Sequence, residues 1–216
     1  MRCLTLCGTL AIFWFAPALA APQLQFDQLP SSPKTIDSAL ADIRRAEWLL
    51  ERHIPFDPVL TVINRSLSWL EKKLEQNEPE NYRLNLTQDA FLLLLAAQNP
   101  QAWHGVIEAV AIDLDLKARD CERYGHGRLV PVEVRTLKNS QPDNGWRIQY
   151  VWVPTEGKIA RDMWFPAPSS PATWQLPPGS YVLSAQKTVD GKPFTVPGGV
   201  LPVGGKDKVV WTIAVP

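Results

Sequence analysis

The sequence predicts an α+β protein in which a short N-terminal helical region precedes an antiparallel β-sandwich of about seven strands. Apolar residues recur every three or four positions in the first half of the chain, but alternate with polar residues in the second half. Glycine and proline gather in the second half, between the alternating segments. These patterns divide the chain into a helical region at 21–104 and a sandwich domain at 105–216.

Residues 1–20 have the three parts of a secretory signal peptide. Arg2 supplies a positive charge, and the apolar run Leu4–Phe15 follows it. This run is shorter than the ~20 residues that span a bilayer. The sequence Ala18-Leu19-Ala20 then provides the small residues that a signal peptidase requires. We therefore expect a periplasmic or secreted protein with no transmembrane anchor after cleavage.

Charge and cysteine content narrow the classes of partner. The chain has 22 basic and 22 acidic residues, so it lacks the basic excess that neutralises phosphate groups, and no nucleic-acid partner is expected. Two of its three cysteines lie in the signal peptide, which leaves Cys121. A single thiol forms no internal disulfide. We favour a buried or unpaired Cys121 over one that is linked to another molecule.

Three helices are expected before residue 100. The first opens at Ser32-Pro33, an N-cap followed by proline in the first turn, and ends before Pro55. The second opens with the same signal at Asp57-Pro58. The third opens near Thr87, with Asp89 in its first turn, where the helix dipole favours an anion.

The segment Val110–Ala118 predicts the first strand, because apolar and polar residues alternate along it. Asp113, Asp115 and Lys117 would then share its polar face. Paired carboxylates are typical calcium ligands, but the lysine beside them favours an ordinary solvated face, and no metal site is predicted.

The rest of the chain shows further short alternating segments with turns between them. Asp190-Gly191 is a hairpin-type turn. The predicted strands are Leu129–Leu137, Trp146–Trp152, Asp162–Phe165, Thr173–Leu176, Tyr181–Lys187, Phe194–Val196 and Val209–Val215.

The segment Trp174–Leu183, WQLPPGSYVL, resembles the strand entry of transthyretin-like and carboxypeptidase-regulatory-like β-sandwich modules. In this interpretation Gly179 permits the turn, and Tyr181 packs inward while its hydroxyl reaches the backbone. The resemblance covers 105–216 and implies an Ig-like sandwich. Such modules usually act as accessory or binding domains, so it implies a fold more than an activity.

Aromatic residues supply the candidate binding side chains. Five of the nine tryptophans lie in the predicted sandwich. Exposed tryptophans stack on sugar rings and anchor protein interfaces. The candidates are Trp164, Trp174, Trp152 and Tyr150. However, Tyr150 and Trp152 share a strand face with Trp146, which is more typical of a core.

The sequence contains no motif for catalysis or cofactor binding. It has no Gly-x-Ser-x-Gly elbow, no glycine-rich phosphate loop and no paired zinc ligands. A site made of His104, Cys121 and His126 would require the fold to gather them, so we predict no catalytic residue and no cofactor. The first hypothesis is a non-catalytic envelope protein that acts through protein–protein interaction. The alternative is a carbohydrate-binding module that uses exposed tryptophans, and a hydrolase is the third.

Overall fold

A computed structural model of the protein describes residues 28–155 and 165–216, in which four α-helices precede eight strands. The helices are α1 (Ile36–His53), α2 (Pro58–Lys73), α3 (Glu80–Ala96) and α4 (His104–Tyr124). The strands are β1 (Val130–Lys138), β2 (Gln141–Pro142), β3 (Arg147–Trp152), β4 (Phe165–Ser169), β5 (Ala172–Leu176), β6 (Gly179–Val189), β7 (Lys192–Val203) and β8 (Val209–Ala214). A short 3-10 segment, η2 (Val153–Thr155), follows β3.

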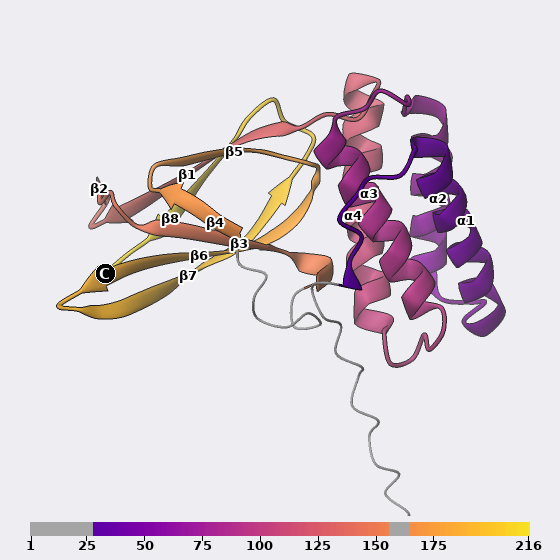
Figure 1. The fold of residues 1–216 in the computed structure, drawn as a ribbon, viewed down its shortest axis with the longest axis horizontal. Coiled ribbons are helices and arrows are strands. Elements are labelled where there is room, and N and C mark those ends of the chain that lie inside the picture. The colour runs from indigo at the N-terminus through magenta and orange to yellow at the C-terminus, as the bar shows by residue number, and fades with distance from the viewer. Residues whose placement is uncertain (1–27, 156–164) are drawn as a thin grey trace, which may run out of the picture.

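The predicted α+β class, with helices first and β-sheets after them, is confirmed. Figure 1 shows the helices packed side by side at one end of the molecule and the sheets at the other. Helices α3 and α4 lie nearest the strands, and α1 and α2 lie on the far side. The predicted signal peptide falls on residues outside the described ranges. No helix of the described residues is long and apolar enough to cross a membrane.

The first two helices have the predicted bounds, with one correction. Helix α1 ends at His53, and the Asp57 side chain accepts from the backbone N–H of Val59 to cap α2. Helix α1 is capped by Thr35 rather than Ser32. The backbone N–H of Lys34 donates to the hydroxyl of Thr87, 3.0 Å away, so the residues around Pro33 run extended beside α3 and the helix begins later.

Helix α3 begins at Glu80, about two turns before the predicted start at Thr87. Asp89 therefore lies in mid-helix, fully buried, rather than in the first turn. Helix α3 packs against both α1 and α4, so side chains on more than one face are buried and its sequence lacks a simple apolar stripe. Acidic residues favour the first turn of a helix, and the sequence prediction rested on that preference. In the structure the packing of α3 instead places Asp89 in the buried middle of the helix.

The predicted strand Val110–Ala118 is wrong, because these residues lie within α4. In the helix Asp113 and Lys117 are one turn apart on the buried face, whereas Ile112 is 55% exposed. Asp115 faces outward and pairs with Arg65, 2.8 Å away, so the two aspartates do not share a face. The helical region thus extends to Tyr124, past the expected boundary at 105.

The strands form two sheets that pack as a sandwich. In the first, β1 pairs with β2 and β5 on one side and with β8 on the other. The second has the order β4-β3-β6-β7 and is antiparallel throughout. The β1–β8 pair is parallel, with Val132 opposite Val209, and is the exception to the predicted antiparallel pattern. The hairpin turn at Asp190-Gly191 is confirmed, and both residues have positive φ. Strand β7 extends well beyond the predicted Phe194–Val196.

A buried cluster of charges joins the helices to the second sheet. The ammonium of Lys117 lies 2.7 Å from a carboxylate oxygen of Asp89 and 3.3 Å from one of Asp113, and all three side chains are fully buried. Asp113 also accepts hydrogen bonds from the indole N–H of Trp152 and from the backbone N–H of Ser180. The cluster therefore connects α3 and α4 with β3 and β6.

Gly179, at the start of β6, leaves room for this cluster. A Cβ on Gly179 would lie 2.7 Å from an oxygen of Asp113. Its φ is not in the left-handed region, so the glycine serves close approach and not the predicted turn. Tyr181 packs inward as predicted, and its hydroxyl donates to the carbonyl of Pro177 over 2.9 Å.

The Lys117→Ala substitution should lower the free energy of unfolding by about 3–5 kcal/mol, because it leaves two buried carboxyl groups without their cation. Urea denaturation measures this loss. Lys72→Ala, at an exposed position of α2, is the control and should change stability by less than about 0.5 kcal/mol. Equal effects of the two substitutions would contradict the structural role of Lys117.

The Gly179→Ala substitution should lower the free energy of unfolding by about 1–3 kcal/mol, because the added methyl group overlaps the Asp113 carboxylate. Gly105→Ala is the control, since Gly105 lies in α4 with nothing within 4 Å of an added Cβ. Alanine favours the helix there by up to about 1 kcal/mol. Thermal unfolding should therefore show a lower midpoint for Gly179→Ala and an equal or higher midpoint for Gly105→Ala, each compared with the unmodified protein.

Candidate functional site

The predicted binding residues have different environments in the structure. Trp152 is buried, with 4% of its surface exposed, and its indole N–H donates a hydrogen bond to Asp113. Tyr150 and Trp174 are half-buried and meet edge to face, with ring centroids 5.4 Å apart. Trp164 lies outside the described residues. The fold thus brings Tyr150 and Trp174 together, but it uses Trp152 as a core residue.

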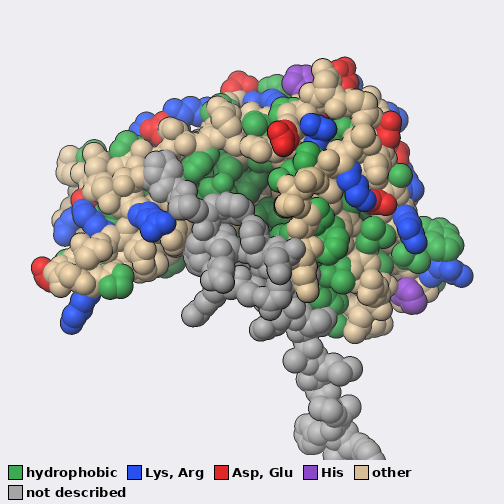
Figure 2. Space-filling model, viewed as in Figure 1, with side chains coloured by type: hydrophobic (Ala, Val, Ile, Leu, Met, Phe, Trp, Pro, Cys, Tyr) green, Lys and Arg blue, Asp and Glu red, His purple; other side chains and the backbone are tan. Residues whose placement is uncertain are grey.

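Tyr150 and Trp152 also line a cavity of about 190 Å³ between α3 and the strands β3, β5 and β6, which we call the seam cavity. Figure 2 shows hydrophobic side chains gathered in the recess between the helices and the sheets. Aromatic, aliphatic and amide side chains line the cavity, and none of its described lining residues is charged. They are Leu29, Asn81, Leu84, Asn85, Gln88, Tyr150, Trp152, Gln175, Leu176, Pro177 and Tyr181.

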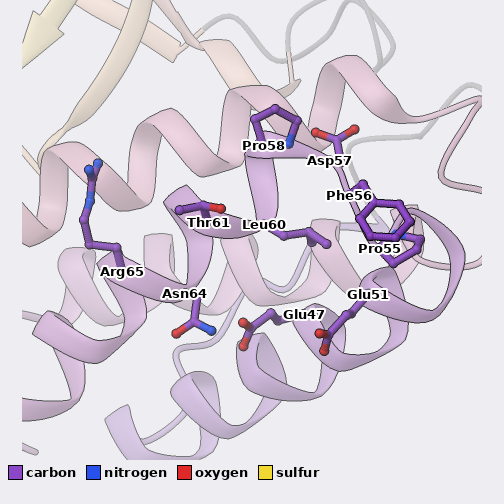
Figure 3. A pocket seen from close by; sticks show the side chains of 10 residues that line it. All are labelled: Glu47, Glu51, Pro55, Phe56, Asp57, Pro58, Leu60, Thr61, Asn64 and Arg65. Carbon is purple, nitrogen blue, oxygen red and sulfur yellow. The ribbon is translucent and has the colours of Figure 1, made fainter.

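A second hollow surface lies between α1 and α2, at the end of the molecule away from the sheets. It consists of two adjoining hollows of about 520 and 600 Å³, which share Glu47, Glu51 and Asn64. We call them together the α1–α2 groove. Figure 3 shows Glu47 and Glu51 on α1, facing the side chains of α2, with Phe56 at one end. Trp48 lines the other end.

The aromatic residues of this groove are strongly exposed. Phe56 is 96% exposed in the connection between the helices, and Trp48 is 54% exposed on α1. The sequence reasoning missed both, because it searched for binding residues among the strands. A signal was present: Trp48 lies off the apolar stripe of α1, so a helix packed by that stripe leaves the indole outside.

The charges along the groove are mostly paired. Arg44 lies 2.8 Å from Glu47 and 2.9 Å from Glu71, and the guanidinium of Arg52 covers the ring of Trp48. Asp57 accepts from the ring of His104 over 2.7 Å. Among the described residues that line the groove, Glu51 and Arg45 have no ion pair. The groove therefore offers two aromatic side chains, one unpaired carboxylate and one unpaired guanidinium.

The residues that a metal or hydrolase site would require are not brought together. His104 contacts Asp57 and Glu108, whereas His126 lies near Glu78 in the loop after α4. Cys121 is buried as predicted, and its thiol lies 3.6 Å from the hydroxyl of Tyr82. Burial raises the pKa of Cys121 to about 11, which keeps the thiol protonated and unreactive. No group of three metal-ligating side chains is found in the described part of the chain.

Burial also perturbs the ionisation of the charge cluster at the junction. Burial raises the pKa of Asp89 to about 7, although the ammonium of Lys117 opposes the rise. Burial also raises the pKa of Asp113, but Lys117, Trp152 and Ser180 favour its charged form. One ammonium balances one carboxylate, so Asp89 holds a proton below about pH 7. Because all three side chains are fully buried, the cluster has a structural role and no access for a substrate.

Comparison with protein-family models, with curated protein sequences and with solved structures found no match to this chain. The class that can be stated is therefore structural: an α+β protein in which a bundle of helices is joined to a β-sandwich by a buried charge cluster. The two surfaces described above are the observations on which a functional proposal rests.

Stability should fall as the pH rises from about 4 to 7. An acid whose pKa is raised by folding binds its proton more tightly in the folded state. Its contribution to the free energy of unfolding is therefore fully present below the unfolded pKa of about 4. That contribution is lost as the pH approaches the folded pKa of Asp89, about 7. The Asp89→Asn variant should show a flatter dependence of its thermal midpoint over this range.

His104→Ala is the control for this prediction. The hydrogen bond to Asp57 raises the pKa of His104 above 6.5. The stability that His104 contributes is therefore lost only at higher pH, as the pH passes the folded pKa of the histidine. The His104→Ala variant should therefore keep the slope between pH 4 and 6. An Asp89→Asn variant with the slope of the unmodified protein would contradict the assignment.

Proposed function

We propose that the chain is an exported, non-catalytic protein of the cell envelope or extracellular space that binds a protein partner through the α1–α2 groove. The observation that carries this proposal is the exposure of Phe56 and Trp48 beside a groove on the face of the bundle opposite the sheets. Export rests on the signal-peptide pattern of residues 1–20.

Large exposed aromatic side chains are favourable anchors for a partner. Burying a Phe side chain contributes about 1.5–3 kcal/mol, and tryptophan is enriched among the residues that dominate interface energies. Neither Phe56 nor Trp48 packs in the core, so their contribution to the fold is small. A partner that covers both side chains would gain this burial.

The groove favours one kind of occupant. Two neighbouring helices with a hollow between them accept the apolar face of an amphipathic helix. The unpaired carboxylate of Glu51 favours a basic residue on that helix, and the unpaired guanidinium of Arg45 favours an acidic one. We propose an amphipathic helical segment of another protein, with apolar anchors for Phe56 and Trp48 and a lysine or arginine near Glu51.

The exposed strand β7 is a poor alternative docking site. It forms an edge of its sheet, where a partner strand would require free backbone N–H groups. Pro193, Pro197 and Pro202 lie along it and have no N–H to donate. Strand addition at this edge is therefore disfavoured.

The alternative, carbohydrate binding on a platform of exposed tryptophans, has less support. Trp146 and Trp152 are buried, and Trp174 and Trp211 are half-buried. Trp211 donates its indole N–H to the carbonyl of Gly198. Such a platform requires exposed rings, and none of the described tryptophans in this half of the chain is exposed, since two are buried and two are half-buried.

Replacement of Phe56 and Trp48 by alanine should abolish partner binding and leave the fold intact. The tagged full-length chain would be expressed in its native host, cross-linked in the intact envelope, and its partner identified by mass spectrometry. Each single substitution should weaken binding of that purified partner by about tenfold or more, since a loss of 1.4 kcal/mol corresponds to a factor of ten.

Ile112→Ala is the matched control, because Ile112 is also an exposed apolar residue of the bundle but does not line the groove. Its affinity for the partner should be unchanged. A partner that binds the Phe56→Ala and Trp48→Ala variants as tightly as the unmodified chain would refute the proposed surface.

A further inference from the structure

We propose that the seam cavity is a binding site for a single neutral sugar ring. This proposal goes beyond the protein-docking function, because the cavity lies between α3 and the sheets and shares no lining residue with the α1–α2 groove. It also differs from an open tryptophan platform, because the ligand would enter a small recess that opens to solvent.

The lining of the cavity defines the chemistry of its ligand. Its described residues carry no charge, so none of them would form an ion pair with an ammonium, carboxylate or phosphate group. Four of them carry amide side chains, which both donate and accept hydrogen bonds: Asn81, Asn85, Gln88 and Gln175. Asn81 and Gln175 are exposed and Gln88 donates to the carbonyl of Pro30, so a purely apolar ligand would leave the buried Asn85 amide without a partner. A neutral ligand with several hydroxyl groups satisfies both conditions.

Asn85 provides an independent indication of a ligand. It lines the cavity, is only 8% exposed, and its side-chain carbonyl oxygen accepts no hydrogen bond. An unpartnered buried acceptor opposes folding unless something donates to it. A hydroxyl group of the ligand is a donor of the required kind.

The aromatic side chains of the cavity supply apolar surface. The indole N–H of Trp152 donates to Asp113, and the hydroxyl of Tyr181 donates to the carbonyl of Pro177. With these polar groups used within the protein, the two rings offer carbon surface to a ligand. The C–H face of a sugar packs on such rings, while its hydroxyls reach the amides.

The size of the cavity limits the ligand to one ring. Its volume of about 190 Å³ is below the range of about 300–1,000 Å³ that is typical of pockets for drug-sized molecules. A single sugar, or the terminal ring of a longer glycan, is the ligand that this volume and lining favour.

The test uses D-glucose, D-galactose and N-acetyl-D-glucosamine as probes of the full chain, with saturation-transfer NMR to detect the bound sugar. We expect transfer to at least one of the three. The Asn85→Leu substitution keeps the size of the side chain and removes its polar group. This variant should weaken binding of that sugar at least tenfold, while its thermal midpoint stays equal or rises because the unpartnered oxygen is gone.

A second variant and a control keep the outcome decisive. Gln175 lines the cavity but is exposed, so Gln175→Leu should not destabilise the fold. This substitution should also weaken sugar binding. Gln186→Leu changes an amide of β6 that does not line the cavity and should leave binding unchanged.

Three results would overturn the proposal: no transfer to any of the three sugars, equal binding by the Asn85→Leu variant, or preferential binding of a neutral amide such as N-acetyl-leucinamide. Because Phe56 and Trp48 do not line the cavity, the Phe56→Ala and Trp48→Ala variants should bind the sugar normally. Failure of one proposal is thus distinguishable from failure of the other.

Discussion

The contact on which the rest of the architecture depends is the buried cluster of Lys117, Asp89 and Asp113. Charged groups are buried at a high cost in hydration, and they persist only where opposite charge and hydrogen bonds replace the lost water. Here the ammonium lies between two carboxyl groups, and Asp113 also accepts from Trp152 and from the backbone of Ser180. These groups lie on four elements, α3, α4, β3 and β6, so the cluster constrains how the helices pack on the second sheet.

This arrangement decides which surfaces are left for binding. Helices α3 and α4 provide the cluster and lie against the sheets, while α1 and α2 remain on the outside (Figure 1). The α1–α2 groove, with its exposed aromatics, is a consequence of that division. The same junction creates the seam cavity, because Trp152 is held by Asp113 and forms part of the cavity wall. The packing around the charge cluster therefore leaves both proposed binding surfaces accessible, while the polar groups of the cluster itself are buried.

Two kinds of binding in one chain are compatible, because they use separate surfaces. The groove presents exposed rings and an unpaired carboxylate, which suit a protein segment. The cavity presents an uncharged lining with an unpartnered amide oxygen, which suits a small hydroxylated ring. The sequence hypotheses of protein binding and carbohydrate binding thus correspond to different proposed places in the structure, and the cavity uses Tyr150 and Trp152 as part of its wall and not as an exposed platform.

Local sequence patterns determined those helices and strands whose buried positions coincide with their apolar residues. Three features were predictable because their signals lie within a few residues of one another. They are the N-cap and proline at Asp57-Pro58, the end of α1 at His53 and the turn at Asp190-Gly191. Helix α4 was not predictable in this way. Its buried face includes Asp113 and Lys117, so the apolar residues that remain alternate as they would in a strand. Only the tertiary structure, which pairs those charges with Asp89 and Trp152, makes that face an interior one. The seam cavity has the same origin, since residues from α3 and from three strands form it and no local pattern relates them.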